Sequence, residues 1–192
     1  FAPHAGNVFR QHKSFQLEDT DMHEMNLSIT KALHRDHLTT IALLERLETD
    51  LNRQGAASPA DANDGATRAL LTDLTTVLEA EVKGHFAFEE THLFPRFAEY
   101  IDPGIPSMLQ DEHEIIRPLA ESIVRQARAA LAEGFDAASW RVFHQQGLEL
   151  VEREVFHIQK EEMGFLPALE QILEPSDDLE LSMAYSESGG NV

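Results

Sequence analysis

Four long segments of the 192-residue chain repeat apolar residues at steps of three and four positions, which is the spacing of amphipathic helices. In the first segment, which begins at Ser28, the residues Leu33, Ile41 and Leu44 follow this spacing. The alternation of apolar and polar residues that strands require is nearly absent. The other three segments cover about 66–100, 107–133 and 137–173. The chain is therefore predicted to be all-α.

Short breaks separate the helical segments. The stretches NRQGAASPADANDG (52–65) and IDPGIP (101–106) are rich in residues that interrupt helices. Four amphipathic helices with short connections are typical of an antiparallel up-and-down four-helix bundle. We expect this bundle over residues 28–174, after an N-terminal extension over 1–27 and before an acidic, flexible tail over 175–192.

Each predicted helix carries a histidine on its apolar stripe, and two of the helices add a glutamate four residues later. Residues i and i+4 lie one above the other on a helix, so each His-x-x-x-Glu unit presents an imidazole and a carboxylate to the interior. In a bundle the four apolar stripes face one axis, which brings these side chains together. The six candidate metal ligands are His37, His85, Glu89, His113, His157 and Glu161.

The two His-x-x-x-Glu units lie in similar surroundings. The stretch HFAFEETHLFP begins at His85, and HIQKEEMGFLP begins 72 residues later at His157. An acidic residue also directly precedes each of the other two histidines, in RDH (35–37) and DEH (111–113). The chain is thus a rough repeat of two helix pairs, and the pattern predicts a site with pseudo-twofold symmetry.

Composition excludes several other kinds of site. The chain has no cysteine, which excludes thiolate zinc sites, iron–sulfur clusters and thiol catalysis. The formal net charge of −19 repels phosphate backbones and anionic lipids, so neither nucleic acid nor a membrane is an expected partner. The opening stretch FAPHAGNVF has no features of a signal peptide. We expect a cytoplasmic protein that is a monomer or a homodimer.

A pair of metal ions would explain carboxylates on the apolar stripes. Two buried carboxylates that face each other are costly unless cations neutralise them. Imidazole suits iron, copper, zinc and nickel, and a bridging carboxylate suits two hard ions that lie close together. Six protein side chains are too few to saturate two six-coordinate irons, which leaves positions for a bridging oxygen and an exogenous ligand.

Each part of this pattern also has a simpler explanation. A single histidine on an apolar face is usually a hydrogen-bonded core residue, and one His-x-x-x-Glu pair also occurs on exposed helix surfaces. Four such histidines on separate helices, with two matched glutamates, favour the metal site. Glu90 and Glu162 are rotated by about 100° from the candidate ligands, so we expect them to face solvent or to contact a ligand.

The order His, His-x-x-x-Glu, His, His-x-x-x-Glu resembles the hemerythrin-like HHE cation-binding domain over about residues 27–173. The resemblance implies a four-helix bundle with a non-haem di-iron site, whose two iron ions share carboxylate bridges and an oxo or hydroxo bridge. The implied ligands are His37 and His85 for one iron, His113 and His157 for the other, and Glu89 and Glu161 as the bridges.

This chain differs from the oxygen-carrying hemerythrins at two positions. Those proteins have a second histidine on the third helix where this chain has Arg117. Their last carboxylate is an aspartate five residues after the final histidine, whereas Glu161 stands four residues after His157. The chain is therefore more similar to the bacterial type with four histidines and two glutamates. Relatives of that type are associated with oxygen or nitric oxide sensing, iron handling, repair of iron centres and peroxide decomposition.

The expected function is the binding of a small ligand, namely oxygen, nitric oxide or peroxide, at an open di-iron centre. Two alternatives stay open, which are a di-iron peroxidase or catalase-like enzyme and an iron storage or delivery protein. No separate catalytic base or substrate pocket is legible, so no catalytic residue is assigned. Affinity order alone does not select iron over zinc or manganese.

Several further residues compete for a place near the site. His34 is the main alternative to the histidine of the first helix, and His92 is expected to face inward, as a contact of a ligand or in place of one. Glu81 and Glu154, about one turn before the paired histidines, are candidates to orient an imidazole N–H group. The histidines expected to face solvent are His4, His12, His23 and His144.

Overall fold

The computed structural model describes residues 25–188, so most of the expected N-terminal extension and the last four residues lie outside the described residues. Within this range the chain is helical, without strands. None of the described helices is long and apolar enough to cross a membrane. In chain order, with η for π-helical turns, the elements are α2 (Ser28–Gln54), α3 (Gly65–Ala80), η2 (Glu81–His85), α4 (Phe86–Phe88), η3 (Glu89–Leu93), α5 (Phe94–Tyr100), α6 (Gly104–Glu133), α7 (Ala137–Lys160), η4 (Glu161–Phe165), α8 (Leu166–Ile172) and α9 (Pro175–Glu187).

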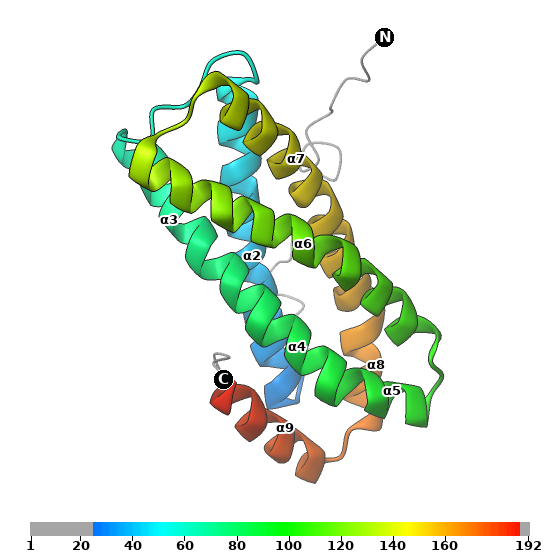
Figure 1. Ribbon diagram of the computed structural model, residues 1–192. Helices are drawn as coiled ribbons and strands as arrows, with labels where there is room; N and C mark the ends of the chain where they lie inside the picture. The colour runs from blue at the N-terminus through cyan, green and yellow to red at the C-terminus, as the bar shows by residue number, and fades with distance from the viewer. Residues whose placement is uncertain (1–24, 189–192) are drawn as a thin grey trace.

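These elements build four long helices and one addition. The second long helix runs continuously from α3 to α5, and the fourth runs from α7 to α8. Helix α2 packs against α3, α3 against α6, α6 against α7, and α7 again against α2 (Figure 1). The four long helices therefore close a ring, and the predicted all-α bundle is confirmed.

The bundle interior has two apolar parts with a polar layer between them. One apolar cluster includes Leu44, Leu74 and Phe143 and fills the end near the α2–α3 loop. The other cluster includes Leu33 and Phe97 and fills the opposite end. Buried histidines and glutamates occupy the level between the two clusters. The apolar residues that define the helical periodicity thus keep a polar layer away from water.

Helix α6 begins earlier than the sequence pattern predicts. We expected its start at about residue 107, but the helix begins at Gly104 and contains Pro106 in its first turn. A proline is tolerated there because the first N–H groups of a helix have no acceptor within it. Half of the stretch IDPGIP therefore belongs to the helix.

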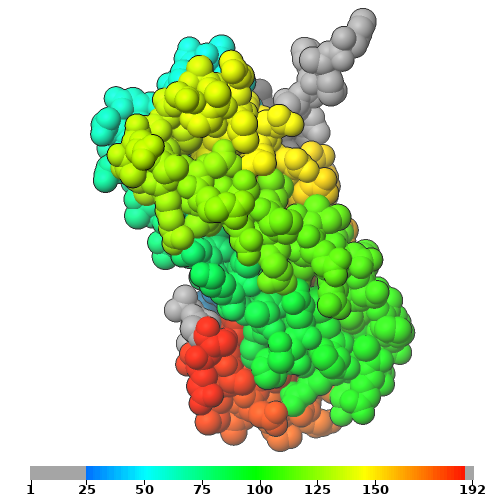
Figure 2. Space-filling model, in the orientation of Figure 1, coloured from blue at the N-terminus to red at the C-terminus, as the bar shows by residue number. Residues whose placement is uncertain are grey.

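The expectation of a flexible tail is wrong for residues 175–187, which form α9. This helix packs against the beginning of α2 at one end of the bundle (Figure 1). In Figure 2 its red residues cover this end of the molecule beside the green residues of the second long helix. Leu181 and Tyr185 are each only 1% exposed. Two large buried side chains therefore dock a segment whose composition is otherwise acidic and polar.

Acidic residues of the C-terminal region also cap α2. The residue at the N-cap position of this helix is Leu27, which has no side-chain acceptor. The carboxylate of Asp178 accepts hydrogen bonds from the backbone N–H groups of Ser28 at 2.9 Å and Ile29 at 2.8 Å. Glu170 accepts two more from the preceding backbone N–H groups. Free N–H groups and the helix dipole favour negative side chains at this position, which fixes the acidic segment in place.

The capping contact predicts a loss of stability in Asp178→Ala. Removal of a carboxylate that caps a helix N-terminus costs about 1 kcal/mol, and the free energy of unfolding should fall by this amount in denaturant titrations. The matched control is Glu180→Ala, because Glu180 pairs with Arg96 while its side chain is 71% exposed. Such surface pairs contribute about 0–1 kcal/mol. Equal losses in the two variants would contradict the capping role.

Candidate metal centre

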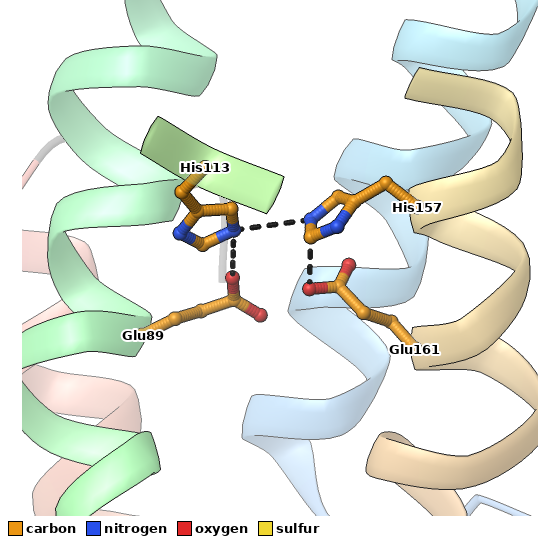
Figure 3. A group of neighbouring side chains, drawn as sticks. All are labelled: Glu89, His113, His157 and Glu161. Carbon is orange, nitrogen blue, oxygen red and sulfur yellow. Dashed lines mark hydrogen bonds and ion pairs between the residues drawn. The ribbon is translucent and has the colours of Figure 1, made fainter. Parts of the chain in front are cut away.

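The bundle brings all six predicted ligands into the buried polar layer. Figure 3 shows four of them pointing toward one another from three of the long helices. Each of the six side chains is at most 2% exposed. Their positions are His37 on α2, His85 at the end of η2, Glu89 at the start of η3, His113 on α6, His157 on α7 and Glu161 at the start of η4.

The four histidines form two close pairs. The Nε2 atoms of His37 and His85 lie 3.2 Å apart, and those of His113 and His157 lie 3.0 Å apart. Bonds from a metal ion to imidazole nitrogen are about 2.0–2.1 Å long. Two nitrogens at these separations can therefore share one cation.

Each glutamate reaches one member of each histidine pair. For Glu89, Oε1 lies 3.5 Å from Nε2 of His85, and Oε2 lies 3.5 Å from Nε2 of His113. For Glu161, Oε2 lies 3.0 Å and Oε1 lies 3.1 Å from Nε2 of the remaining histidine of each pair. The two oxygens of each carboxylate thus face different histidine pairs, as a bridging ligand requires.

The carboxylate oxygens of Glu89 and Glu161 lack hydrogen bonds. None of these four buried atoms has a hydrogen-bond partner among the described residues. The imidazole nitrogens come within ion-pair distance, but not along the direction of an N–H···O bond. Unpaired buried charges cost on the order of several kcal/mol each. Cations between the carboxylates would remove this cost, so the residues fit bound metal cations.

The pKa values of these groups show the same conflict between burial and charge. Burial raises the pKa of Glu89 to about 7, and the charge of Glu161 contributes to the rise. Burial opposes protonation of His37, but the carboxylates of Glu161 and Glu162 outweigh it and raise the pKa to about 10. Burial lowers the pKa of His113 to about 2. Without cations, some imidazoles must hold protons to balance the carboxylates, and bound metal ions would replace those protons.

Comparison with known families agrees with this geometry. Residues 28–169 match the family described as the hemerythrin HHE cation binding domain, which covers most of the chain. The chain belongs to this hemerythrin family. Comparison with curated proteins gives no match. The protein therefore has a hemerythrin-type cation-binding domain, and its bundle contains a cluster of histidines and glutamates that could bind metal.

Carboxylates from neighbouring helices orient the histidines of this hemerythrin-type centre. They contact the Nδ1 atom, on the far side of the ring from Nε2. Such contacts fix the orientation of an imidazole and leave Nε2 directed at a cation. The pairs are His37 with Glu162 at 2.5 Å, His113 with Glu90 at 2.9 Å and His157 with Glu112 at 3.0 Å. Glu90 and Glu162 thus contact candidate ligands, which is one of the two arrangements expected from the sequence. The sequence did not indicate a role for Glu112.

Glu81 and Glu154 do not orient the imidazoles. Glu81 accepts a hydrogen bond from Thr40 at 2.8 Å, and neither oxygen of Glu154 has a hydrogen-bond partner among the described residues. Both side chains are buried, at 5% and 1% exposure. However, the Nδ1 atoms point toward neighbouring helices, so carboxylates on those helices reach them first.

Among the other histidines, only His34 lies next to the centre within the described residues. It is fully buried, and its Nδ1 lies 2.9 Å from Glu162, so it contacts the carboxylate that holds His37. His92 is exposed, so the expectation that it faces inward is wrong. His144 is half-buried rather than solvent-facing, and its Nε2 lies 3.1 Å from a backbone carbonyl oxygen. Outside the described residues are His4, His12 and His23.

Three π-helical turns coincide with the centre. Turn η2 ends at His85, η3 begins at Glu89, and η4 begins at Glu161. Such turns are rare in proteins and frequent at functional sites. A wider turn changes the direction of the side chains within it. As a result, Glu161 and Glu162 are both buried and contact the centre from the same turn.

The unpaired carboxyl of Glu154 predicts a pH effect on the metal-free protein. Burial and the charge of Glu81 raise the pKa of Glu154 to about 8, from the ordinary value of 4.5. Between these two pH values the unfolded chain binds fewer protons than the folded chain, so the stability contribution of this group falls as pH rises. Glu154→Gln should therefore lose less stability than the wild type between pH 4.5 and 8, measured by denaturant unfolding at several pH values.

The control for this experiment is Glu152→Gln, because Glu152 is exposed on the same helix. Its stability should follow the wild-type pH curve. Parallel curves for the wild type and Glu154→Gln would show that Glu154 ionises in the folded protein as it does in the unfolded chain.

Proposed function

We propose that the protein is a non-haem di-iron protein of the hemerythrin type that binds a small ligand such as oxygen, nitric oxide or peroxide. One observation carries this proposal. Glu89 and Glu161 each direct one oxygen at each histidine pair, in a buried layer where those oxygens have no other partner. This arrangement supports a role for the two carboxylates as bridges between two cations.

The contacts support three kinds of role for the six side chains. We propose that one iron is held by His37 and His85 and the second by His113 and His157, with both glutamates as bridges. Each ion then has four protein donor atoms, whereas iron commonly takes six ligands. Two iron ions held in this way would supply redox chemistry and vacant coordination positions for a small ligand. The donor set of imidazoles and carboxylates without thiolate is compatible with iron.

The surrounding residues hold the imidazoles and exclude water. The ring of Phe86 stacks on His113 with centroids 3.8 Å apart, and the ring of Phe94 lies 5.5 Å from the same imidazole. The carboxylates at the Nδ1 atoms keep the rings from turning. Because the six side chains that would bind metal are at most 2% exposed, an exogenous molecule of only a few atoms suits the site. This burial supports a diatomic molecule or peroxide over a larger substrate.

The bridging role predicts the loss of both metal ions in Glu161→Ala. Protein purified from iron-supplied cells should contain two irons per chain by elemental analysis, and this variant should contain none, since Glu161 contacts both histidine pairs. Glu149→Gln is the control, because Glu149 pairs with Arg153 on the exposed face of α7. Retention of one iron in Glu161→Ala would contradict the bridge, and zinc or manganese in the wild type would contradict the iron assignment.

Open coordination predicts a response to nitric oxide. Anaerobic addition of nitric oxide to the protein loaded with ferrous iron should change its absorption spectrum, whereas the protein loaded with zinc should not respond. An unchanged spectrum of the iron protein would show that no position is open. Peroxide turnover faster than that of free iron would favour the enzyme alternative, and more than two irons per chain would favour storage.

A further inference from the structure

The orientation of the fourth histidine differs from that of the other three. In three of the histidines Nδ1 lies 2.5–3.0 Å from a glutamate oxygen. For His85 the acidic side chain in this position is Asp36, whose Oδ2 lies 3.8 Å away. This distance is too long for a hydrogen bond. A direct contact with a carboxylate therefore does not hold His85.

The internal repeat explains this gap. Asp36 directly precedes His37, just as Glu112 directly precedes His113. Glu112 reaches Nδ1 of His157 at 3.0 Å. Asp36 stands in the equivalent place opposite His85, but its side chain is one methylene shorter. The two halves of the pseudo-twofold site thus differ by one CH₂ group at this point.

Tyr185 of helix α9 fills the gap. Its hydroxyl oxygen lies 3.3 Å from Nδ1 of His85, and its O–H donates to the carboxylate of Asp36. The ring is 1% exposed and packs against Phe88 with centroids 4.7 Å apart. The hydroxyl can accept from the N–H of the imidazole while it donates to the carboxylate. It therefore connects two groups that are too far apart to hydrogen-bond directly.

Local sequence also explains why α9 docks on this half of the site. A Cβ atom on Gly84, the residue before His85, would lie 3.9 Å from the carbonyl oxygen of Ser188 at the end of α9. The equivalent position before His157 is Phe156. A phenylalanine ring extends well beyond its Cβ atom, whereas Gly84 has no side chain next to the end of α9. The small residue and the shorter acid therefore occur together on the side where the helix packs.

We propose that Tyr185 is a positioning residue that acts as a relay, because its hydroxyl links the carboxylate of Asp36 to Nδ1 of His85. The metal position of His37 and His85 thereby depends on helix α9. This inference rests on the proposed di-iron function. Tyr185 and α9 lie outside the span that matches the hemerythrin family, which ends at residue 169. The two metal positions are inequivalent, since the position of His113 and His157 is supported by glutamates from within the bundle.

The test uses Tyr185→Phe, which keeps the ring and removes the hydroxyl. Chelator-treated protein is titrated anaerobically with Fe²⁺ in a calorimeter. The wild type should bind two ions. The variant should bind one ion with the wild-type affinity and the other about tenfold to 100-fold more weakly, because loss of a contact behind a metal ligand has effects of this size. Tyr100→Phe is the matched control, since Tyr100 is 62% exposed. Circular dichroism should show the same helix content in all three proteins.

A second variant separates the relay from a merely structural role. In Asp36→Glu combined with Tyr185→Phe, the longer acid should reach His85 directly and restore binding of the second ion. A pocket of about 400 Å³ adjoins Asp36, His85 and Tyr185, which gives the longer side chain space. Failure of this rescue, when Tyr185→Phe alone is weakened, would contradict the relay through Asp36.

The outcomes distinguish this inference from the proposed function. If the wild type binds no Fe²⁺, the di-iron function is wrong whatever Tyr185 does. If the wild type and Tyr185→Phe both bind two ions with equal affinity, the di-iron function stands and the role of Tyr185 is wrong. A readout without metal is the ¹⁵N spectrum of the histidine side chains, in which Tyr185→Phe should shift the signals of His85 and Tyr100→Phe should not.

Discussion

Two carboxylates face each other inside an apolar bundle, and the rest of the structure depends on this contact. Glu89 and Glu161 are fully buried, and their oxygens lack hydrogen-bond partners among the described residues. Such a pair destabilises a fold unless positive charge lies between the two groups. The four imidazoles, the π-helical turns and the outer carboxylates are all arranged around that requirement. The apolar clusters on either side exclude water, so water cannot solvate the two carboxylates in place of positive charge.

Charge alternates outward from this contact, layer by layer. Imidazoles surround the two inner carboxylates, and outer carboxylates contact the imidazoles. Each outer carboxylate then has a partner of its own. Glu90 binds Arg117, Glu112 binds Lys160, and Glu162 contacts His34. Asp36 instead binds the neutral hydroxyl of Tyr185. Polar contacts in a low dielectric environment strengthen one another, so these linked outer contacts hold the imidazoles more firmly than isolated pairs would.

The sequence predicts the bundle and the inner residues well, for a physical reason. Helical periodicity and the i, i+4 relation are local, so His85 with Glu89 and His157 with Glu161 can be recognised without a structure. Contacts between helices cannot be read in this way. The role of Glu112 and the docking of α9 depend on which helices become neighbours. The expectation of a flexible tail was wrong because acidic composition does not indicate that Asp178 caps another helix or that Tyr185 is buried.

The cap on α2 has a consequence for the order of assembly during synthesis. Helix α2, which carries His37, leaves the ribosome before the other bundle helices. The N–H groups of Ser28 and Ile29 in its first turn gain their acceptor only after residue 178 has been made. Tyr185 follows seven residues later and reaches His85 from the same short helix. The surroundings of the histidine pair from the first half of the bundle therefore include a contact that cannot form until the C-terminal segment has been made.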